Sequence, residues 1–369
     1  MRKLIVIFLA AAVLAAAGAY VGAGMQAPPS ITIAKPGKFA GASIPIDVVV
    51  GAKGEISPTD IDIAVEQNGT RTTVSSTTGA TGEFHWTNTV GAKDGLKVAA
   101  GPAKVIVTAK RKVWKLRTVS AETIVDTTIR LEKPRVSVVS TKHYINLGGA
   151  EMIVYRATPS DVESGVRVGD IEYKGFSTTG DLHVAFFALR YDQTLNEKMQ
   201  VFARDVSGEQ ATSDFDHLTF AKKPFKKSTI PLDDKFLDRV VPAILAGTKE
   251  IDPQGSTVEK FVAINSELRK KNNATIHSMA EKTAPTMLWT EVFYPFTNTK
   301  AEASFADFRT YVYNGKEVDK QVHLGFDLAS FANTAVLAAN KGKVLFAKEL
   351  GIYGNCIIID HGMGVQSLY

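Results

Sequence analysis

The sequence predicts a mainly β chain with an apolar N-terminal helix and a short helical segment before its C-terminal block. Three observations carry this prediction. Met1-Arg2-Lys3 is followed by an uncharged apolar run that reaches about residue 25. Short runs of alternating apolar and polar residues, separated by turn residues, then extend from about residue 30 to residue 225. After the basic, proline-bearing stretch 222–231 the apolar period changes from two to 3.6.

Length and composition narrow the possible classes of protein. A chain of 369 residues is too long for one compact core, so we expect two or three domains. A hydrophobic content of 45% and a charged content of 22% argue against a wholly disordered chain. The net charge of +5 is mild, no nucleic-acid motif is present, and the single cysteine, Cys356, excludes an internal disulfide. Cys356 lies in an apolar run and is expected to be buried.

Short basic clusters are the only other charge feature. They lie at residues 110–117 and 222–227. Solvated strand ends and linkers are the simpler interpretation, and attraction to an anionic cell wall or to lipid headgroups is the functional alternative.

The segment 1–25 is predicted to be a signal peptide or a membrane anchor. A basic start followed by an apolar segment is typical of an export signal, and about 20 apolar residues also suffice to span a bilayer. We favour a retained anchor because the apolar run exceeds the usual core of a signal peptide. In both cases the rest of the chain is exported, to the periplasm or cell envelope, and the membrane is a partner.

Residues 30–132 are predicted to form an Ig-like β-sandwich. Several short strands follow one another at the spacing typical of sandwiches, and Asn68-Gly69 is a strong signal for a two-residue hairpin turn. The clearest candidate strands are 44–48, 61–65, 104–110 and 128–131. His85 is read as a strand residue. This module contains no cluster of catalytic residue types, so a spacer or binding role is expected.

A second β-rich, sandwich-like module is predicted at residues 135–225. Its candidate strands are 152–156, 171–173, 184–189 and 199–203. His143, His183 and His217 lie far apart in the sequence without the spacing of metal ligands, so they are expected to be structural or surface residues.

A helical linker is predicted at residues 232–285. Ser256 and Glu259 form a capping box that begins an amphipathic helix, and Asn272 is expected to end it. A shorter helix at 235–241 is expected to be interrupted at Pro242. Packing is the simpler role for the amphipathic stripe, and covering a cleft of the next domain is the functional alternative.

The block 288–369 carries the residues with catalytic potential. Asn314-Gly315 predicts a hairpin, and the sequence HLGFDLA follows at 323–329. His323 and Asp327 would lie roughly 13 Å apart on a straight strand, too far to bind one zinc ion at about 2.0–2.2 Å. We therefore expect Gly325 to let the chain bend, so that the two side chains converge as half of a zinc site.

The order of the later motifs supports a specific family. HLGFDLA is followed by a GKV strand at 342–344, a GIYGN turn at 351–355, the strand and turn IIIDHGMG at 357–364 and a final Leu-Tyr. This combination resembles the lysostaphin/LytM-type zinc metalloendopeptidases, which cut peptidoglycan cross-bridges. The resemblance covers about the last 60 residues and implies a LytM-like peptidase domain, built on an antiparallel β-sheet and present in part.

The resemblance implies roles for particular residues. His323 and Asp327 map onto two zinc ligands, so the implied cofactor is zinc and the implied partner is peptidoglycan. The third ligand and the catalytic histidines would lie beyond Tyr369, so no catalytic residue is assigned within the chain. We accordingly expect a C-terminally incomplete, inactive domain.

Three further residues have two interpretations each. Tyr311 and Tyr313 could bind substrate at the rim of the site, although packing within a strand is the simpler role. His361 could in chemical terms be a third ligand, but its family counterpart stabilises a turn.

Two functions remain open. The first is an exported or anchored zinc endopeptidase of the cell wall. The second is a non-catalytic scaffold or hydrolase regulator with a degenerate peptidase domain, and the presence of both His323 and Asp327 weighs against it.

Overall fold

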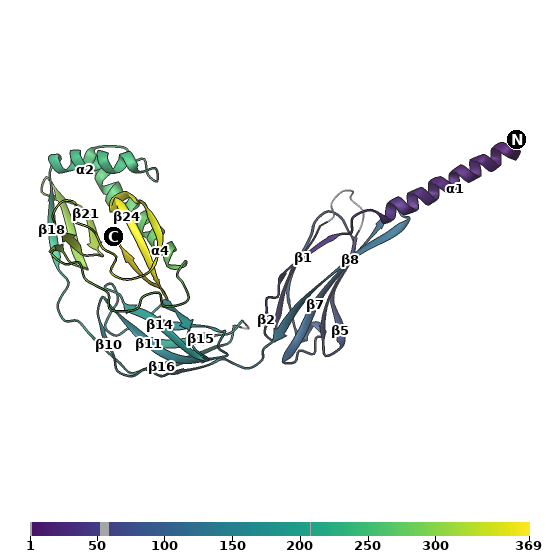
Figure 1. The fold of residues 1–369 in the computed structure, drawn as a ribbon, viewed down its shortest axis with the longest axis horizontal. Helices are drawn as coiled ribbons and strands as arrows, with labels where there is room; N and C mark the ends of the chain where they lie inside the picture. The colour runs from purple at the N-terminus through teal and green to yellow at the C-terminus, as the bar shows by residue number, and fades with distance from the viewer. Residues whose placement is uncertain (1, 52–58, 207) are drawn as a thin grey trace. The chain divides into compact units, whose positions relative to one another are not determined.

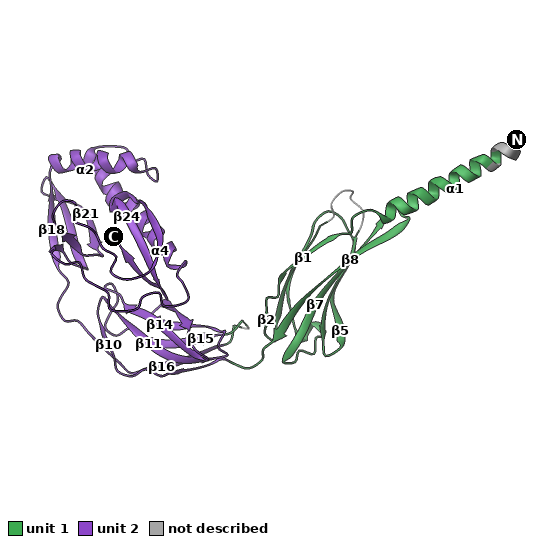
Figure 2. Cartoon of the chain, in the orientation of Figure 1, with its two compact units in different colours: residues 1–133, 205–209 green, residues 134–204, 210–369 purple. Residues whose placement is uncertain are grey.

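The computed structural model describes residues 2–51, 59–206 and 208–369 (Figure 1). Contacts divide the chain into two compact units, residues 1–133 with 205–209 and residues 134–204 with 210–369 (Figure 2). The fold is mainly β with an apolar N-terminal helix, as the sequence predicted.

The first unit is a β-sandwich preceded by the helix α1 (Arg2–Gly24). A sheet of β1, β3 and β6 packs against a sheet in the order β2-β8-β7-β4-β5. The strands are β1 (Ser30–Lys35), β2 (Phe39–Ala40), β3 (Ile44–Gly51), β4 (Thr59–Gln67), β5 (Thr70–Ala80), β6 (Phe84–Val90), β7 (Gly101–Val113) and β8 (Arg117–Ile129), with a 3-10 turn at Ala92–Asp94.

The alternating pattern explains this sandwich. Successive residues of β3 are buried and half-buried in turn, so one face of the strand packs into the core with residues such as Ile63 and Val105. The predicted hairpin is confirmed, because β4 and β5 are joined at Asn68 and Gly69, which both have positive φ. His85 lies on β6, as expected.

The second unit begins with a larger β structure. A sheet in the order β16-β15-β12-β13-β14-β11-β9 encloses a core with the parallel pair β10 and β17, around the buried side chains of Tyr155 and Phe187. The strands are β9 (Arg135–Val138), β10 (His143–Asn146), β11 (Gly149–Thr158), β12 (Glu163–Val168), β13 (Ile171–Ser177), β14 (Leu182–Leu189), β15 (Met199–Arg204), β16 (Gln210–Asp214) and β17 (His217–Phe220).

The helical segment differs from its prediction at two places. The capping box of Ser256 and Glu259 is confirmed at the start of α3 (Thr257–Ala263). The expected end at Asn272 is wrong, because a π-helical turn, η2 (Ile264–Leu268), leads into α4 (Arg269–Ala280). Asn272 is buried inside α4 and its Oδ1 accepts a hydrogen bond from the backbone N–H of Ile352, so tertiary packing outweighs the local stop signal.

The expected interruption at Pro242 is also wrong. The helix α2 (Asp234–Gly247) continues through this residue. Leu237 and Val241 are buried before the proline, and Leu245 packs against the same core after it. Burial on both sides keeps the helix continuous at the cost of one backbone hydrogen bond.

The C-terminal strands form three small sheets. β18 (Lys227–Leu232) pairs in parallel with β20 (Asp307–Tyr313), and β20 pairs antiparallel with β21 (Lys316–His323). Residues 227–231 of the basic, proline-bearing stretch therefore belong to a strand, and its residues Ile230 and Leu232 pack in one core with residues of α2 and α3. The other sheets are β19 (Lys300–Ala303) with β22 (Asp327–Ala329), and β23 (Lys343–Glu349), β24 (Asn355–Gly362) and β25 (Val365–Leu368), with a 3-10 turn, η3, at Gly351–Tyr353.

Candidate functional site

His323 and Asp327 lie at the junction of two of these sheets. His323 is the last residue of β21 and pairs with Asp307 of β20, whereas Asp327 is the first residue of β22 and pairs with Ala303 of β19. The chain changes sheets over residues 324–326. The imidazole Nε2 of His323 consequently lies 3.3 Å from Oδ1 of Asp327, so the predicted convergence is confirmed.

The expectation that Gly325 allows the chain to bend is wrong. Gly325 is absent from the described residues with positive φ, so the bend does not need the conformational freedom of glycine. A Cβ placed on Gly325 would meet only Cε1 of His323, at 4.0 Å. The change of sheet partner between β21 and β22 therefore brings the two side chains together.

The ring nitrogen of His323 is buried and unsatisfied. The side chain is 15% exposed, against 55% for Asp327. Nε2 has no hydrogen-bond partner among the described residues, since the contact with Asp327 is close enough for an ion pair but lacks hydrogen-bond geometry. A buried nitrogen without a partner costs free energy, so its retention points to a ligand.

Burial is the main reason why the pKa of His323 is lowered from its ordinary value. The carboxylate of Asp327 opposes this shift, and the guanidinium of Arg309 adds to it. The imidazole is therefore neutral at neutral pH, which is the form that coordinates metal ions.

Two residues of β20 that the sequence analysis did not single out complete the polar cluster. Arg309 Nη2 lies 3.6 Å from Oδ2 of Asp327, and its Nε donates to Oδ2 of Asp307 at 3.3 Å. Asp307 is buried and accepts a hydrogen bond of 2.7 Å from Ser228. Burial would raise the pKa of Asp307, but the hydrogen bonds from Ser228 and Arg309 outweigh it and lower the pKa.

Asp307 and Arg309 could have been found from the alternation of β20. Residues 307, 309 and 311 share one face of a strand, and the Asn314-Gly315 turn, together with a bulge between Tyr311 and Val312, sets the register that brings His323 opposite Asp307. The side chain of Arg309 thus reaches Asp327 from a strand of another sheet.

The two candidate substrate residues make contacts of their own. Tyr311 is buried, its ring lies 5.7 Å from that of Phe261, and its hydroxyl helps to raise the pKa of Arg309 against the opposing effect of burial. The hydroxyl of Tyr313 donates to Asp234 at the start of α2, at 2.7 Å. The structure therefore brings Tyr311 to the polar cluster and engages Tyr313 with a helix.

His361 is held by its surroundings. It is fully buried at the end of β24, and its Nδ1 and Nε2 lie 2.6 Å from the carbonyl oxygen of Lys341 and 2.8 Å from the hydroxyl of Ser367. Its neighbour Asp360 accepts hydrogen bonds from the hydroxyl of Thr283 and from the N–H groups of Ala284 and Gly362. These contacts clamp the 283–288 segment onto the turn, which is a structural role.

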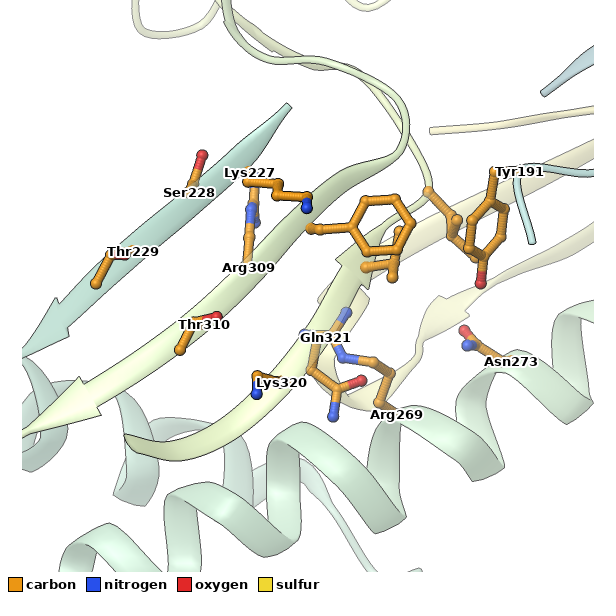
Figure 3. Close-up of a pocket in the computed structure, with 13 residues that line it drawn as sticks. Tyr191, Lys227, Ser228, Thr229, Arg269, Asn273, Arg309, Thr310, Lys320 and Gln321 are labelled. Carbon is orange, nitrogen blue, oxygen red and sulfur yellow. The ribbon is translucent and has the colours of Figure 1, made fainter. Parts of the chain in front are cut away.

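A cavity of about 530 Å³ opens beside the polar cluster (Figure 3). Four of its lining residues are cations, and none carries a carboxylate. The cavity is lined by Tyr191, Lys227, Ser228, Thr229, Arg269, Asn273, Phe308, Arg309, Thr310, Lys320, Gln321, Val322 and Leu324. The helix α4 contributes Arg269 and Asn273 to this lining.

Within the described ranges, no group of three or more His, Cys, Asp or Glu side chains is arranged to hold a metal ion. His323 and Asp327 are thus a pair of candidate ligands. In α1, the segment Ile7–Gly24 is long and apolar enough to cross a membrane, with a mean hydropathy of 2.0.

Comparisons with solved structures returned low similarities. Fibronectin(III)-like modules of Clostridium thermocellum CbhA share 16% identity over 52% of this chain and 94% of theirs, with a TM-score of 0.35. Murine CEACAM1b shares 13% identity over 51% of this chain and 100% of its own, with a TM-score of 0.23. No functional inference rests on likenesses this weak.

A comparison with curated proteins found no match. The model of peptidase family M23 matches residues 321–369, which include His323, Asp327, Asp360 and His361. The resemblance found in the sequence is confirmed over this range. The C-terminal residues 321–369 are therefore similar to peptidase family M23.

Proposed function

We propose that the C-terminal block is a zinc metalloendopeptidase domain that acts on peptidoglycan cross-link peptides in the cell envelope. One observation carries the proposal: a buried, unsatisfied imidazole nitrogen faces a carboxylate 3.3 Å away, inside the segment that matches peptidase family M23.

The donor atoms of both side chains suit zinc, and the imidazole is in the neutral form that coordinates metal ions. Imidazole nitrogen and carboxylate oxygen are zinc ligands in proteins, and the two donors flank the bend between β21 and β22 at 3.3 Å from each other. His323 and Asp327 would hold the ion. The resemblance implied an inactive domain, and two protein ligands among the described residues allow at most weak zinc binding and slow turnover, so we expect any peptide release by this chain to be slow.

When bound, zinc supplies an activated water and polarises the scissile carbonyl. The residues of the chain have their own tasks. His323 offers a neutral ring nitrogen that has no hydrogen-bond partner among the described residues. Arg309 holds Oδ2 of Asp327, so that Oδ1 stays directed at the imidazole. Tyr311, next to Arg309, remains the better placed of the two tyrosines for a substrate contact.

The cavity beside the cluster is proposed to take the peptide substrate. Its cations, Lys227 and Arg269 among them, would attract the free carboxylates of a cross-link peptide, and Leu324 gives the wall next to His323 an apolar part.

Export follows from the same proposal, because peptidoglycan lies outside the cytoplasm. We propose that α1 is a retained membrane anchor with the sandwich and the peptidase block on the outer side of the membrane. The exposure of its apolar side chains supports this role, since a core helix would bury them.

The test is the release of peptides from purified peptidoglycan in the presence of zinc, followed by mass spectrometry. We expect release by the unaltered chain that is lost in His323→Ala and kept in His277→Ala, an exposed histidine of α4. Binding to peptidoglycan without any release, unaffected by His323→Ala, would contradict the enzyme and favour a second candidate, a non-catalytic cell-wall scaffold or hydrolase regulator. The weak zinc site motivates that candidate.

A further inference from the structure

The first unit has a distinctive end where α1 meets the sandwich. The long strands β7 and β8 form a hairpin whose tip is Trp114, Lys115 and Leu116. Trp114 and Lys115 have positive φ, and the N–H of Leu116 donates to the carbonyl of Val113, so the tip is a tight turn. Both apolar residues of the tip are 48% exposed.

The end of α1 lies against this tip. A Cβ on Gly22 would be 3.4 Å from the indole of Trp114, and one on Gly24 would collide with the guanidinium of Arg117. The same guanidinium lies over the ring of Tyr20, 5.3 Å from its centroid. Contacts from three residues of the helix therefore set the tip beside the last turn of the apolar span.

The backbone after the helix is also attached to β7. The buried side chain of Arg111 donates a hydrogen bond of 2.7 Å to the carbonyl of Ala27. This bond ties the segment that follows the helix to β7, three residues before Trp114 at the hairpin tip.

The chemistry of the tip matches a lipid surface. Tyrosine and tryptophan prefer the level of the headgroups, and the tip places Trp114 beside Gly22, two residues after Tyr20, at the end of the apolar span. The hairpin has no acidic residue between positions 110 and 120, and it carries four exposed cations around the tip. These are Lys110, Lys112, Lys115 and Arg117. The nearest acidic partners across the ladders, Asp60 and Glu122, lie opposite Lys110 and Thr108, further from the tip.

We propose that the tip of the β7–β8 hairpin is a membrane-contact site that inserts Trp114 and Leu116 at the headgroup level and binds anionic phospholipid headgroups through the surrounding lysines and Arg117. The proposal rests on α1 being a retained anchor. Contact at two places, the helix and the tip, restrains the tilt of the sandwich on the membrane.

The opposite end of the sandwich offers a matched control. The β4–β5 hairpin tip at Asn68 and Gly69 has the same kind of turn, with positive φ at both residues. In the ladder, Gln67 pairs with Ala103, ten residues along β7 from Val113, or roughly 33 Å. A bilayer surface at Trp114 therefore cannot reach Asn68.

The experiment uses the full chain, with Cys356→Ala, reconstituted in vesicles of phosphatidylcholine and phosphatidylglycerol. A fluorophore is attached at Lys115→Cys or at Asn68→Cys. We expect aqueous iodide to quench the label at 115 about threefold less than the label at 68, and brominated lipids to quench only the label at 115. Replacing Lys110 and Lys112 by glutamate should reduce the shielding at 115 in anionic vesicles.

Two results would overturn the proposal, and they are distinguishable. Equal iodide quenching at 115 and 68, in protein that floats with the vesicles, would be consistent with the anchor but would contradict the membrane contact of the hairpin. Protein that does not float with the vesicles would contradict both the anchor and the membrane contact of the hairpin. Neither result bears on peptide release from peptidoglycan, which is measured separately.

Discussion

Two histidine and aspartate pairs in the C-terminal block have opposite environments. At Asp360 and His361 every polar atom of the carboxylate and of the ring has a close partner, and both residues are fully buried. At His323 and Asp327 the ring nitrogen is buried without a hydrogen bond, and the carboxylate is half exposed. Satisfied polar groups stabilise the fold, whereas an unsatisfied one is available for a ligand.

The largest effect on the fold should come from breaking the satisfied pair. Asp360→Ala leaves the hydroxyl of Thr283 and the N–H of Ala284 without their acceptor, so we expect a loss of roughly 2–4 kcal/mol in local stability. Hydrogen exchange of the β24 and 283–288 amides measures it. Unchanged protection of these amides would mean that the clamp does not hold the segment.

The glycines beside the two pairs, Gly362 and Gly325, also have different surroundings. Gly362 has φ of 90°, and a Cβ there would lie 1.9 Å from the carbonyl oxygen of Thr286, so Gly362→Ala should cost roughly 2 kcal/mol or more. Gly325→Ala should change stability by less than about 0.5 kcal/mol, because its space is open. Protease resistance of both variants compares them, and equal sensitivity would contradict the difference in their surroundings.

Arg309 should affect the ligand pair more than the fold. Arg309→Gln removes the charge beside Oδ2 of Asp327 and the ion pair with Asp307, so zinc affinity should fall about tenfold. Lys226→Gln is the control, since the Nζ of Lys226 lies 4.0 Å from Asp307 and forms no ion pair with Asp327 within the described residues. A similar loss of zinc affinity in both variants would mean that the positive charge near Asp307 matters, and not the contact of Arg309 with Asp327.

The smallest effect is a dependence on pH. The pKa of His323 is lowered by burial, so below its ordinary value of 6.5 the unfolded chain binds a proton that the folded chain does not. The contribution of this residue to stability is therefore present above pH 6.5 and decreases as the pH falls below it. His323→Gln should flatten this part of a metal-free stability profile. A profile that keeps its slope would place the titration on another group.

The sequence predicted the architecture better than the site. Alternation and Asn-Gly turns gave the sandwich and the β20–β21 hairpin, because local patterns determine both. Helix ends at Pro242 and Asn272 were wrong, since long-range packing of Leu245 and Asn272 decided them. The convergence of His323 and Asp327 was expected. The alternation of β20 places Asp307 and Arg309 on one face, but a bulge in the pairing with β21, for which the sequence shows no local signal, brings His323 opposite Asp307.

The central claim is that His323 and Asp327 bind zinc, and competition with a chromophoric chelator measures it directly. We expect the unaltered chain to take up one zinc ion, with affinity at least about tenfold lower in His323→Ala and in Asp327→Ala and unchanged in His277→Ala. Equal affinity in all four proteins, or no zinc uptake by the unaltered chain, would contradict the claim.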